Sequence, residues 1–451
     1  MSEHDHRGET FRDAAFWNER YRSAASIWSG NPNPQLVAEA SSLTPGRALD
    51  VGCGEGADAI WLAQRGWDVV ATDLASVALE RGAQHARDTD PRAAERIEWH
   101  QADLLVDPPE RDAFDLVSVH FMQLPPAPRT QLFTALVASV RPGGFIDTST
   151  LDCFAGRVRS TSDLASQVCN PRQLNPQTGP FHVEGARPGD TLAVHFVSIE
   201  PREAWGVSST VPFFGALTST PTTATLQPAL PELTWIYELD RDARLVHYRA
   251  RESDHTVALA MDPMHGTVGV APALGEVRSS LAPGDWGGNM DTPEMRAGTT
   301  CYLGVNVEGA LLSFGDGHAR QGEGEPCGVA VECAMDSLVG VDLLEGVATP
   351  WPRLENDEFL MTTGSTKPLE DAFRIAHVQM VRWVSELTGL SEMDSYQLVA
   401  QVALTPVANV CDTVYTMVCK VPKRCLPGVV AMGGAHSRMQ AAARRLGGAR
   451  P

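Results

Sequence analysis

The order of apolar and polar positions divides the chain into two parts with different patterns. Between residues 47 and 145, short apolar stretches alternate with stretches of helical spacing. The pattern predicts strands over 47–51, 67–72, 96–100, 114–121 and 145–150, and helices over 57–64, 76–87 and 127–140. Such alternation is typical of right-handed β-α-β crossovers, so we expect a parallel sheet in this part.

From about residue 150 the pattern changes, because Gly and Pro become frequent and the apolar segments become short. Residues 191–199 (TLAVHFVSI) are among the longest of these segments, and 328–333 (GVAVEC) are typical of the short ones. This pattern predicts a β-rich domain with many turns. Helical spacing returns after residue 367, and we interpret the helices over 367–404 as a packing layer or a subunit interface. The predicted fold class is α/β, with a Rossmann-like parallel sheet followed by a β-rich mixed α/β domain.

Composition and charge limit the classes of function. The chain has 451 residues, 43% of them hydrophobic, which is enough for two or three domains. Its net charge of −20 disfavours nucleic acid as a partner, since the chain repels phosphate on average. Nine cysteines without CxxC spacing favour reduced thiols over a disulfide scaffold or a zinc ribbon. The N-terminus has no apolar signal region and no apolar run is long enough to span a bilayer, so we expect a cytoplasmic protein without a membrane partner.

A glycine turn lies between the first predicted strand and the first predicted helix, and an acidic residue follows it at the end of the second predicted strand. The glycines are Gly52, Gly54 and Gly56, and Asp73 follows at the end of the second strand. Glycines let the backbone approach a ligand, and the helix N-terminus offers free N–H groups. An acid at this spacing accepts from the ribose hydroxyls of a nucleoside, and Asp103 after the third strand is placed to accept from an adenine amino group.

These segments, LDVGCGEGADAIWLAQRGWDVVATDLA, HQADLL and VRPGG, resemble the class I S-adenosylmethionine-dependent methyltransferases over residues 10–150. The upstream FWNERYRSAASIWSGNPNP resembles the lid segment of small-molecule members. The resemblance implies that S-adenosylmethionine is held by Gly52, Gly54, Gly56, Asp73 and Asp103. One alternative is an NAD-binding fold, although GCGEG lacks the GxGxxG spacing. Another is a methyltransferase fold that no longer binds a ligand, since the family's strands after the fifth are missing here and the domain is truncated.

The second part contains polar clusters set among glycines. They lie at 179–186 (GPFHVEGA), 287–291 (GGNMD), 315–318 (GDGH), 322–325 (GEGE) and 331–333 (VEC). Each cluster alone is typical of turns, because Asp and Asn beside Gly favour turns. Together they offer carboxylates, an amide and an imidazole, which is a ligand set for zinc or a similar divalent ion.

Residues 147–427 resemble the acetamidase/formamidase family, through segments that include TLDCFAGRV, TGPFHVEGARPGDTLAVHFVSI, GGNMDTPEMRAGTTCYLGV and EGALLSFGDGHARQGEGEPCGVAVEC. The resemblance implies hydrolysis of short amides to a carboxylate and ammonia, with a metal ion in the active site. Carried over to this sequence, the metal ligands are Asp291, Asp316, His318 and Glu332, and the catalytic residues are Glu332, Asp316, Asn289 and Glu184. One departure from the family is Trp286, where some relatives carry a His.

The residue types suit amide hydrolysis. A Lewis acid polarises the poorly electrophilic amide and lowers the pKa of bound water, and Glu332 is our first choice to take up and return the proton. His182 and His265 are alternative ligands, although a single histidine is more often at the surface or packed in a core. Cys327 and Cys333 are alternative nucleophiles, but neither has an adjacent His and acid pattern.

The predicted organisation is a methyltransferase-like domain over 1–146, an amidase-like domain over 147–427 and a disordered basic tail over 428–451. Residues 145–158 (FIDTSTLDCFAGRV) serve both resemblances, so our hypothesis is a gene fusion. The function hypothesis is a homo-oligomeric, metal-dependent amidase of formamide- or acetamide-type substrates. The alternatives are a small-molecule methyltransferase whose C-terminal domain binds substrate or is non-catalytic, and a non-catalytic cofactor sensor.

Overall fold

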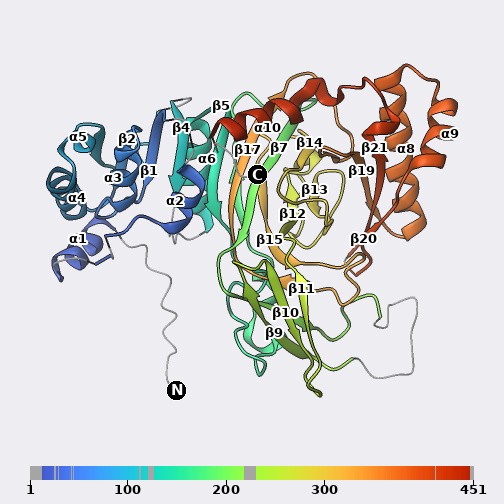
Figure 1. Cartoon of the computed structure of the whole chain (residues 1–451), viewed down its shortest axis with the longest axis horizontal. Helices are drawn as coiled ribbons and strands as arrows, with labels where there is room; N and C mark the ends of the chain where they lie inside the picture. Colours follow the sequence, from blue (N-terminus) through green and yellow to red (C-terminus); the bar gives the residue numbers. More distant parts are fainter. Residues whose placement is uncertain are drawn as a thin grey trace. The chain divides into compact units, whose positions relative to one another are not determined.

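The structure is a computed structural model that describes residues 13–24, 27, 28, 30–41, 43, 45–110, 113–119, 126–217, 230–411 and 413–446. The chain forms two compact units, one made of residues 1–148 with 442–451 and the other of residues 149–441 (Figure 1). Within the described part of the chain, no helix combines the length and the apolar character that crossing a membrane requires.

The first unit contains a parallel five-stranded sheet, as the alternating pattern predicts. Its order is β3 (Ile97–Gln101), β2 (Asp68–Asp73), β1 (Arg47–Val51), β4 (Phe114–Val119) and β5 (Val140–Ser149). All four strand pairs are parallel. The strand order reverses between β1 and β4, and at such a point the carboxyl ends of the strands form a crevice for a ligand.

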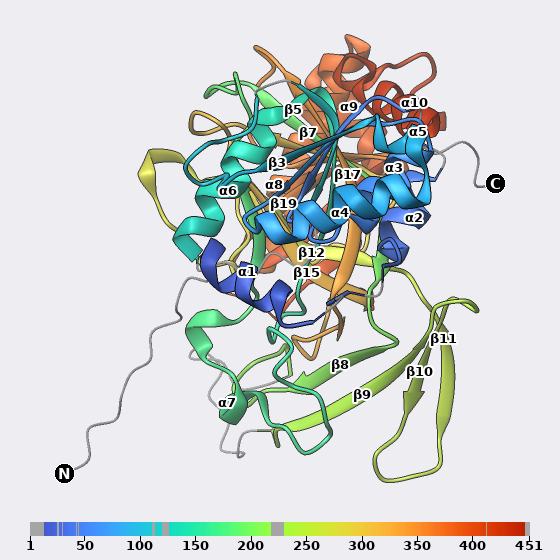
Figure 2. The same ribbon diagram turned by 90° about the vertical axis from the view of Figure 1, so that its left-hand side faces the viewer.

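Six helices accompany this sheet in the described residues. They are α1 (Ala14–Arg22), α2 (Pro34–Ala40), α3 (Ala57–Gln64), α4 (Ser76–Thr89), α5 (Pro91–Ala94) and α6 (Pro126–Ser139) (Figure 2). The predicted helices over 57–64, 76–87 and 127–140 are confirmed. Ile60 and Leu62 of α3 pack with Trp67 and Val69 in a core that is buried from solvent. The apolar stripe of α3 thus fixes the glycine turn that precedes it.

The second unit contains an antiparallel sheet covered by two helices. Its order is β20 (Val407–Asn409), β21 (Tyr415–Pro422), β19 (Phe359–Thr366), β18 (Arg353–Glu355), β14 (Thr300–Gly304), β7 (Thr191–Pro201) and β17 (Met335–Leu344). Helices α8 (Leu369–Thr388) and α9 (Glu392–Val402) lie beside β19 and β21 (Figure 1). Met380 and Trp383 of α8 pack with Val399 of α9 and Met417 of β21.

A further antiparallel sheet of the second unit carries the residues that matter for chemistry. Its order is β11 (Thr256–Ala260), β10 (Leu245–Arg249), β9 (Leu233–Asp240), β8 (Trp205–Thr210), β16 (Val331–Glu332), β15 (Leu312–Arg320), β12 (Met264–Gly269) and β13 (Gly287–Asn289), and β6 (Gln177–Phe181) also pairs with β15. Strands β8 to β11 lie side by side (Figure 2). Short α7 (Ala165–Val168) precedes β6. The predicted β-rich mixed domain is confirmed.

The end of the chain differs from its predicted disorder. Residues 435–446 form α10 (Ala435–Leu446), and Met432, Ala435 and Met439 are buried in the core that contains Trp383. The Gly and Ala content of this segment suggested disorder, but its Ala, Met and Arg residues form helices readily and its apolar side chains recur at helical spacing. The prediction of a disordered tail is therefore corrected for residues 428–446, and residues 447–451 lie outside the described part.

Candidate functional sites

A buried cluster of carboxylates and one imidazole lies on neighbouring strands of the second unit. The register of β15 and β16 places His318 opposite Glu332. The register of β12 and β15 pairs His265 with Gly317 and Thr267 with Gly315, so Gly266 and Asp316 lie between these two pairs. Asp291 follows β13 with only Met290 between them, and its backbone N–H donates to the Gly266 carbonyl at 3.0 Å. Strand pairing therefore brings together residues that the chain keeps up to 66 positions apart.

His318 stands at the centre of this cluster. Its Nε2 lies 3.5 Å from Asp316 Oδ2 and 3.3 Å from Glu332 Oε1. Ligand-type atoms of Asp291, Asp316 and His318 lie within 4.8 Å of one another, and all these side chains are buried. We call Asp291, Asp316, His318 and Glu332 the carboxylate cluster.

Two more residues border the carboxylate cluster. A carboxylate oxygen of Glu325 lies within 4.8 Å of ligand atoms of His318 and Glu332, and the Cys153 sulfur lies within 4.8 Å of oxygens of Asp316 and Glu332.

Three of these residues have a strained backbone: Asp291, Asp316 and Glu325 have φ angles of 46°, 58° and 41°. These left-handed conformations cost energy for residues with side chains, and such strain is typically concentrated at functional sites.

Amide side chains hold Asp291 in place. Its Oδ2 accepts from Asn289 Nδ2 at 2.9 Å and from Asn409 Nδ2 at 3.3 Å. Asn289 Oδ1 accepts in turn from Asn175 Nδ2 at 2.8 Å and from the Thr267 hydroxyl. Because these amides are buried, each hydrogen bond restricts the orientation of the carboxylate.

Gln321 orients the imidazole of His318. Gln321 Oε1 lies 2.8 Å from His318 Nδ1, and Gln321 Nε2 donates to the Asp291 carbonyl at 2.6 Å. Because the Gln321 amide N–H groups are committed to carbonyls, its oxygen accepts the Nδ1 proton. His318 Nε2 is then left directed at the carboxylates.

Burial and charge shift the proton affinities inside the cluster. Burial raises the pKa of the Glu332 carboxyl to about 7, while His318 opposes the rise and Asp316 reinforces it. Burial lowers the pKa of His318, but the negative charges of Glu332 and Asp316 outweigh this effect and hold the pKa well above its usual value. A carboxyl with a pKa near neutrality can both take up and release a proton at physiological pH.

The structure brings five of the six residues predicted for this site together, namely Asn289, Asp291, Asp316, His318 and Glu332. It does not bring Glu184 to them. The Glu184 side chain is 45% exposed and pairs with His182 at 4.0 Å in the segment after β6. His265 is buried with both ring nitrogens hydrogen-bonded, to the Gly315 carbonyl and the Ser337 hydroxyl, so it is a packed histidine rather than a ligand.

Sequence reasoning did not select Cys153, Asn175, Gln321 or Asn409. Cys153 lies within the quoted segment TLDCFAGRV, and Gln321 follows His318 by three residues, so local motifs could have suggested both. Asn409 has no such signal, because it reaches Asp291 only through the fold.

In the first unit, the residues predicted to hold a nucleoside lie on the glycine turn and at the ends of neighbouring strands. Gly52, Gly54 and Gly56 have φ angles of 69°, 54° and 81°, which only glycine adopts without strain. The Gly54 N–H donates to Asp73 Oδ2 at 2.9 Å, and the Ala75 N–H donates to Asp73 Oδ1 at 2.8 Å. The glycine turn after β1 and the end of β2 therefore form one surface.

The segment before β1 contributes aromatic side chains to this surface. Trp28 Nε1 donates to Tyr21 Oη at 3.0 Å, and a Cβ placed on Gly54 would lie 3.0 Å from that Oη. Asp50, which sequence reasoning did not select, is buried beneath the turn, and burial holds the pKa of its carboxyl well above the usual value. Asp103 is half-buried and its Oδ1 accepts from the Leu105 N–H.

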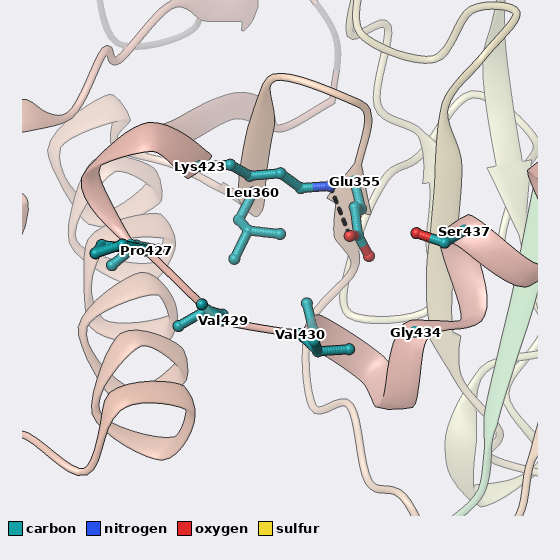
Figure 3. A pocket seen from close by; sticks show the side chains of 11 residues that line it. Glu355, Leu360, Lys423, Pro427, Val429, Val430, Gly434 and Ser437 are labelled. Atoms are coloured by element: carbon teal, nitrogen blue, oxygen red, sulfur yellow. Dashed lines mark ion pairs between the residues drawn. The ribbon is translucent and has the colours of Figure 1, made fainter.

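A separate cavity of about 230 Å³ lies in the second unit, between β18, β19 and the segment before α10 (Figure 3). None of the predicted site residues lines it. Lys423 Nζ pairs with Glu355 Oε1 at 2.8 Å, and the Tyr302 hydroxyl donates to Glu355 Oε2 at 2.7 Å. These charges are therefore balanced within the protein.

Fold and site together define a class: a chain with a Rossmann-like parallel sheet in one unit and a buried cluster of carboxylates and one imidazole on a β-sheet in the other. Comparison with known proteins gives the family. The acetamidase/formamidase family model matches residues 134–280 and 209–370, and the chain belongs to this family of amidohydrolases.

Similar proteins agree with this assignment. The solved acetamidase from Yersinia enterocolitica is 38% identical, with a TM-score of 0.60 over 64% of this chain and 85% of that chain. The acetamidase from Mycolicibacterium smegmatis is 28% identical over 287 residues, or 51% of this chain and 68% of that protein.

The first unit has its own match. A methyltransferase domain model matches residues 48–144. A probable thiol methyltransferase from Arabidopsis thaliana is 33% identical over 82 residues, which are 18% of this chain and 36% of that protein. The chain thus combines a segment that matches a methyltransferase domain model with an acetamidase/formamidase domain.

Proposed function

We propose that the second unit hydrolyses short linear amides, of the formamide and acetamide type, to a carboxylate and ammonia with a divalent metal ion in the carboxylate cluster. The main observation that supports this proposal is the carboxylate cluster, in which three buried carboxylates surround one imidazole in a chain of this family. The acetamidase relatives support the substrate class.

The residues present fit a metal ion. Among the described residues, Glu332 Oε2 is buried and has no hydrogen-bond partner, and His318 Nε2 faces the carboxylates of Asp316 and Glu332, so a cation would take the place of the Nε2 proton between them. Three carboxylates beside one imidazole are also an excess of negative charge in a low-dielectric interior, which a cation would offset. Finally, a Cβ on Gly266 would lie 2.4 Å from Asp291 Oδ1 and 2.5 Å from Asp316 Oδ2, so a glycine keeps this space open.

We assign the ligands to Asp291, Asp316, His318 and Glu332, with zinc as the first choice, because nitrogen and carboxylate ligands suit it. When bound, the ion supplies a Lewis acid that polarises the amide oxygen and lowers the pKa of water. Glu332 takes the proton of the attacking water and returns it to the leaving nitrogen. Asn289 holds Asp291 through its 2.9 Å hydrogen bond, and Gln321 fixes the ring of His318.

The test is ammonia release from formamide and acetamide by the full-length protein, before and after chelation. We expect chelation to abolish release, zinc to restore it and His318→Ala to prevent the restoration. His255→Ala, at an exposed histidine of the same unit, is the matched control. A folded, zinc-loaded protein that releases no ammonia from either amide would refute the proposal for these substrates.

For the first unit we propose binding of S-adenosylmethionine at the glycine turn. Gly54 and Asp73 are already joined by a hydrogen bond, and Asp73 retains lone pairs for ribose hydroxyls. In calorimetric titrations we expect Asp73→Asn to weaken binding at least about tenfold, because a charged acceptor is lost. Asp68→Asn, on the same strand but exposed and paired with Arg96, is the control and should bind like the wild type. Equal affinities of the two variants would place the nucleoside elsewhere.

A further inference from the structure

Cys153 lies at the edge of the carboxylate cluster with its sulfur turned to two of the carboxylates. The Cys153 Sγ, an Asp316 oxygen and a Glu332 oxygen all lie within 4.8 Å of one another. Asp316 and Glu332 come from β15 and β16, whereas Cys153 comes from the segment after β5. No sequence motif for metal binding joins these three positions.

The backbone of Cys153 is fixed from both sides. Asp152 Oδ1 accepts from the Phe154 N–H at 2.9 Å and the Gly156 N–H at 3.0 Å, which closes a tight turn around Cys153. The Asn175 N–H donates to the Cys153 carbonyl at 2.7 Å. Since the side chain of Asn175 also holds Asn289, the turn is connected to the amides that orient Asp291. A side chain with a single χ1 torsion on such a backbone has few positions to occupy.

A second observation points to a ligand at this place. Glu332 is 2% exposed, and its Oε2 has no hydrogen-bond partner among the residues that the structure describes. Buried carboxylate oxygens are normally satisfied, so this oxygen calls for a cation or a donor that the protein does not provide. The neighbouring sulfur is no strong donor, but as a thiolate it is a strong ligand for soft and borderline metal ions.

We propose that Cys153 supplies a thiolate ligand beside Asp316 and Glu332, with the thiol proton released to solvent as the ion binds, so that the site selects a thiophilic divalent ion such as zinc or cobalt over magnesium or calcium. Hard cations prefer oxygen ligands alone, whereas a sulfur in the set favours Zn²⁺ and Co²⁺. The proposal rests on the proposed metal site of the amidase and adds the identity of the ligand that sets ion selectivity.

The test is a cobalt titration of the full-length protein after removal of metals by chelation. A thiolate bound to Co²⁺ gives a near-ultraviolet charge-transfer band, which oxygen and nitrogen ligands do not give. We expect the band in the wild type, its loss in Cys153→Ser, and its retention in Cys169→Ser. Cys169 is the matched control, because it is half-buried and packs in the same apolar cluster as Cys153. We also expect Cys153→Ser to lose about tenfold or more in zinc affinity, with magnesium affinity unchanged.

Alkylation of the wild type keeps the proposal testable if Cys153→Ser fails to fold. Zinc should protect Cys153 from iodoacetamide, whereas the exposed Cys327 should react equally with and without zinc. Cobalt that binds without the band, a band that survives in Cys153→Ser, or no cobalt binding would each overturn the proposal. Ammonia release separates this proposal from the proposed amidase function. Metal-dependent release without the cobalt band refutes only the role of Cys153 as a ligand. The band without release refutes only the amidase function.

Discussion

At the scale of single residues, Gly266 shows how the absence of a side chain makes room for the carboxylate cluster. Its φ lies outside the left-handed region, so alanine fits the backbone, but the new Cβ would meet Asp291 Oδ1 at 2.4 Å and Asp316 Oδ2 at 2.5 Å. We therefore expect Gly266→Ala to displace both carboxylates and to abolish zinc binding, at a stability cost of about 1–3 kcal/mol. Gly322→Ala is the control, since nothing lies within 4 Å of its Cβ position. Zinc titration against a competing chelator measures both, and wild-type affinity in Gly266→Ala would remove this cluster as the metal site.

The same residues show how far the sequence could predict the site. Short sequence motifs were enough to select Asp316, His318 and Glu332. Asp316 and His318 lie two residues apart on β15, and Glu332 of β16 pairs with His318. Glu184 stood in a similar glycine-rich motif, yet the fold leaves it half-exposed beside His182. A motif gives the residue types of a site, whereas the pairing of strands decides which motifs meet.

At the scale of elements, β7, β14 and α10 meet through a chain of polar side chains. Thr300 Oγ1 of β14 lies 2.9 Å from His195 Nδ1 of β7 and 2.9 Å from His436 Nδ1 of α10. Burial, with some contribution from His436, lowers the pKa of His195 from 6.5 to about 4, while Asp357 opposes the shift. The docking of α10 therefore depends on a neutral imidazole.

This arrangement predicts the pH dependence of the second unit. Because the unfolded chain binds the His195 proton more tightly, stability is full above pH 6.5 and falls as the pH drops toward about 4. The lost stability is about 3 kcal/mol for a shift of this size. We expect His195→Gln to reduce this loss, leaving the part due to His436, whose pKa burial also lowers. Urea unfolding at a series of pH values measures the stability, and hydrogen exchange of peptides from β7 and β14 measures the effect on these two strands. A loss as large in His195→Gln as in the wild type would contradict it, and the exposed His255→Gln serves as control.

The elements themselves differ in how well the sequence predicts them. Helix α3 was predicted at its observed bounds, and in the structure Ser391 caps α9 by accepting from the Asp394 N–H. By contrast, α10 was missed, since a Gly- and Ala-rich composition says little about long-range burial. Phe373 of α8 is 43% exposed, although Ala376 and Met380 at helical spacing from it are buried. Local periodicity defines elements, and tertiary packing decides which of their faces are covered.

At the scale of the whole molecule, each unit has apolar clusters of its own. One cluster of the first unit includes Trp67 and Val69, and one of the second includes Met380 and Trp383. The change of pattern near residue 150 in the sequence corresponds to the change from a parallel to an antiparallel architecture. This agreement was predictable because βα alternation and short glycine-bounded strands are local signals. It is consistent with the hypothesis that two genes were joined.

Independent cores make a prediction about fragments of the chain. We expect residues 149–446 to fold cooperatively alone, because they retain the core around Trp383 together with α10. A fragment that ends at residue 427, where the sequence placed the end of the amidase domain, lacks buried Met432, Ala435 and Met439. Their loss costs about 5 kcal/mol of apolar burial, which is a large share of the stability of a typical domain. Thermal unfolding of the two fragments, compared with the full-length protein, measures the difference.

Two outcomes would contradict this prediction. If the shorter fragment unfolds at the same temperature as the longer one, α10 contributes nothing to the stability of this unit. If neither fragment folds while the full chain does, the two units depend on each other for folding despite their separate clusters.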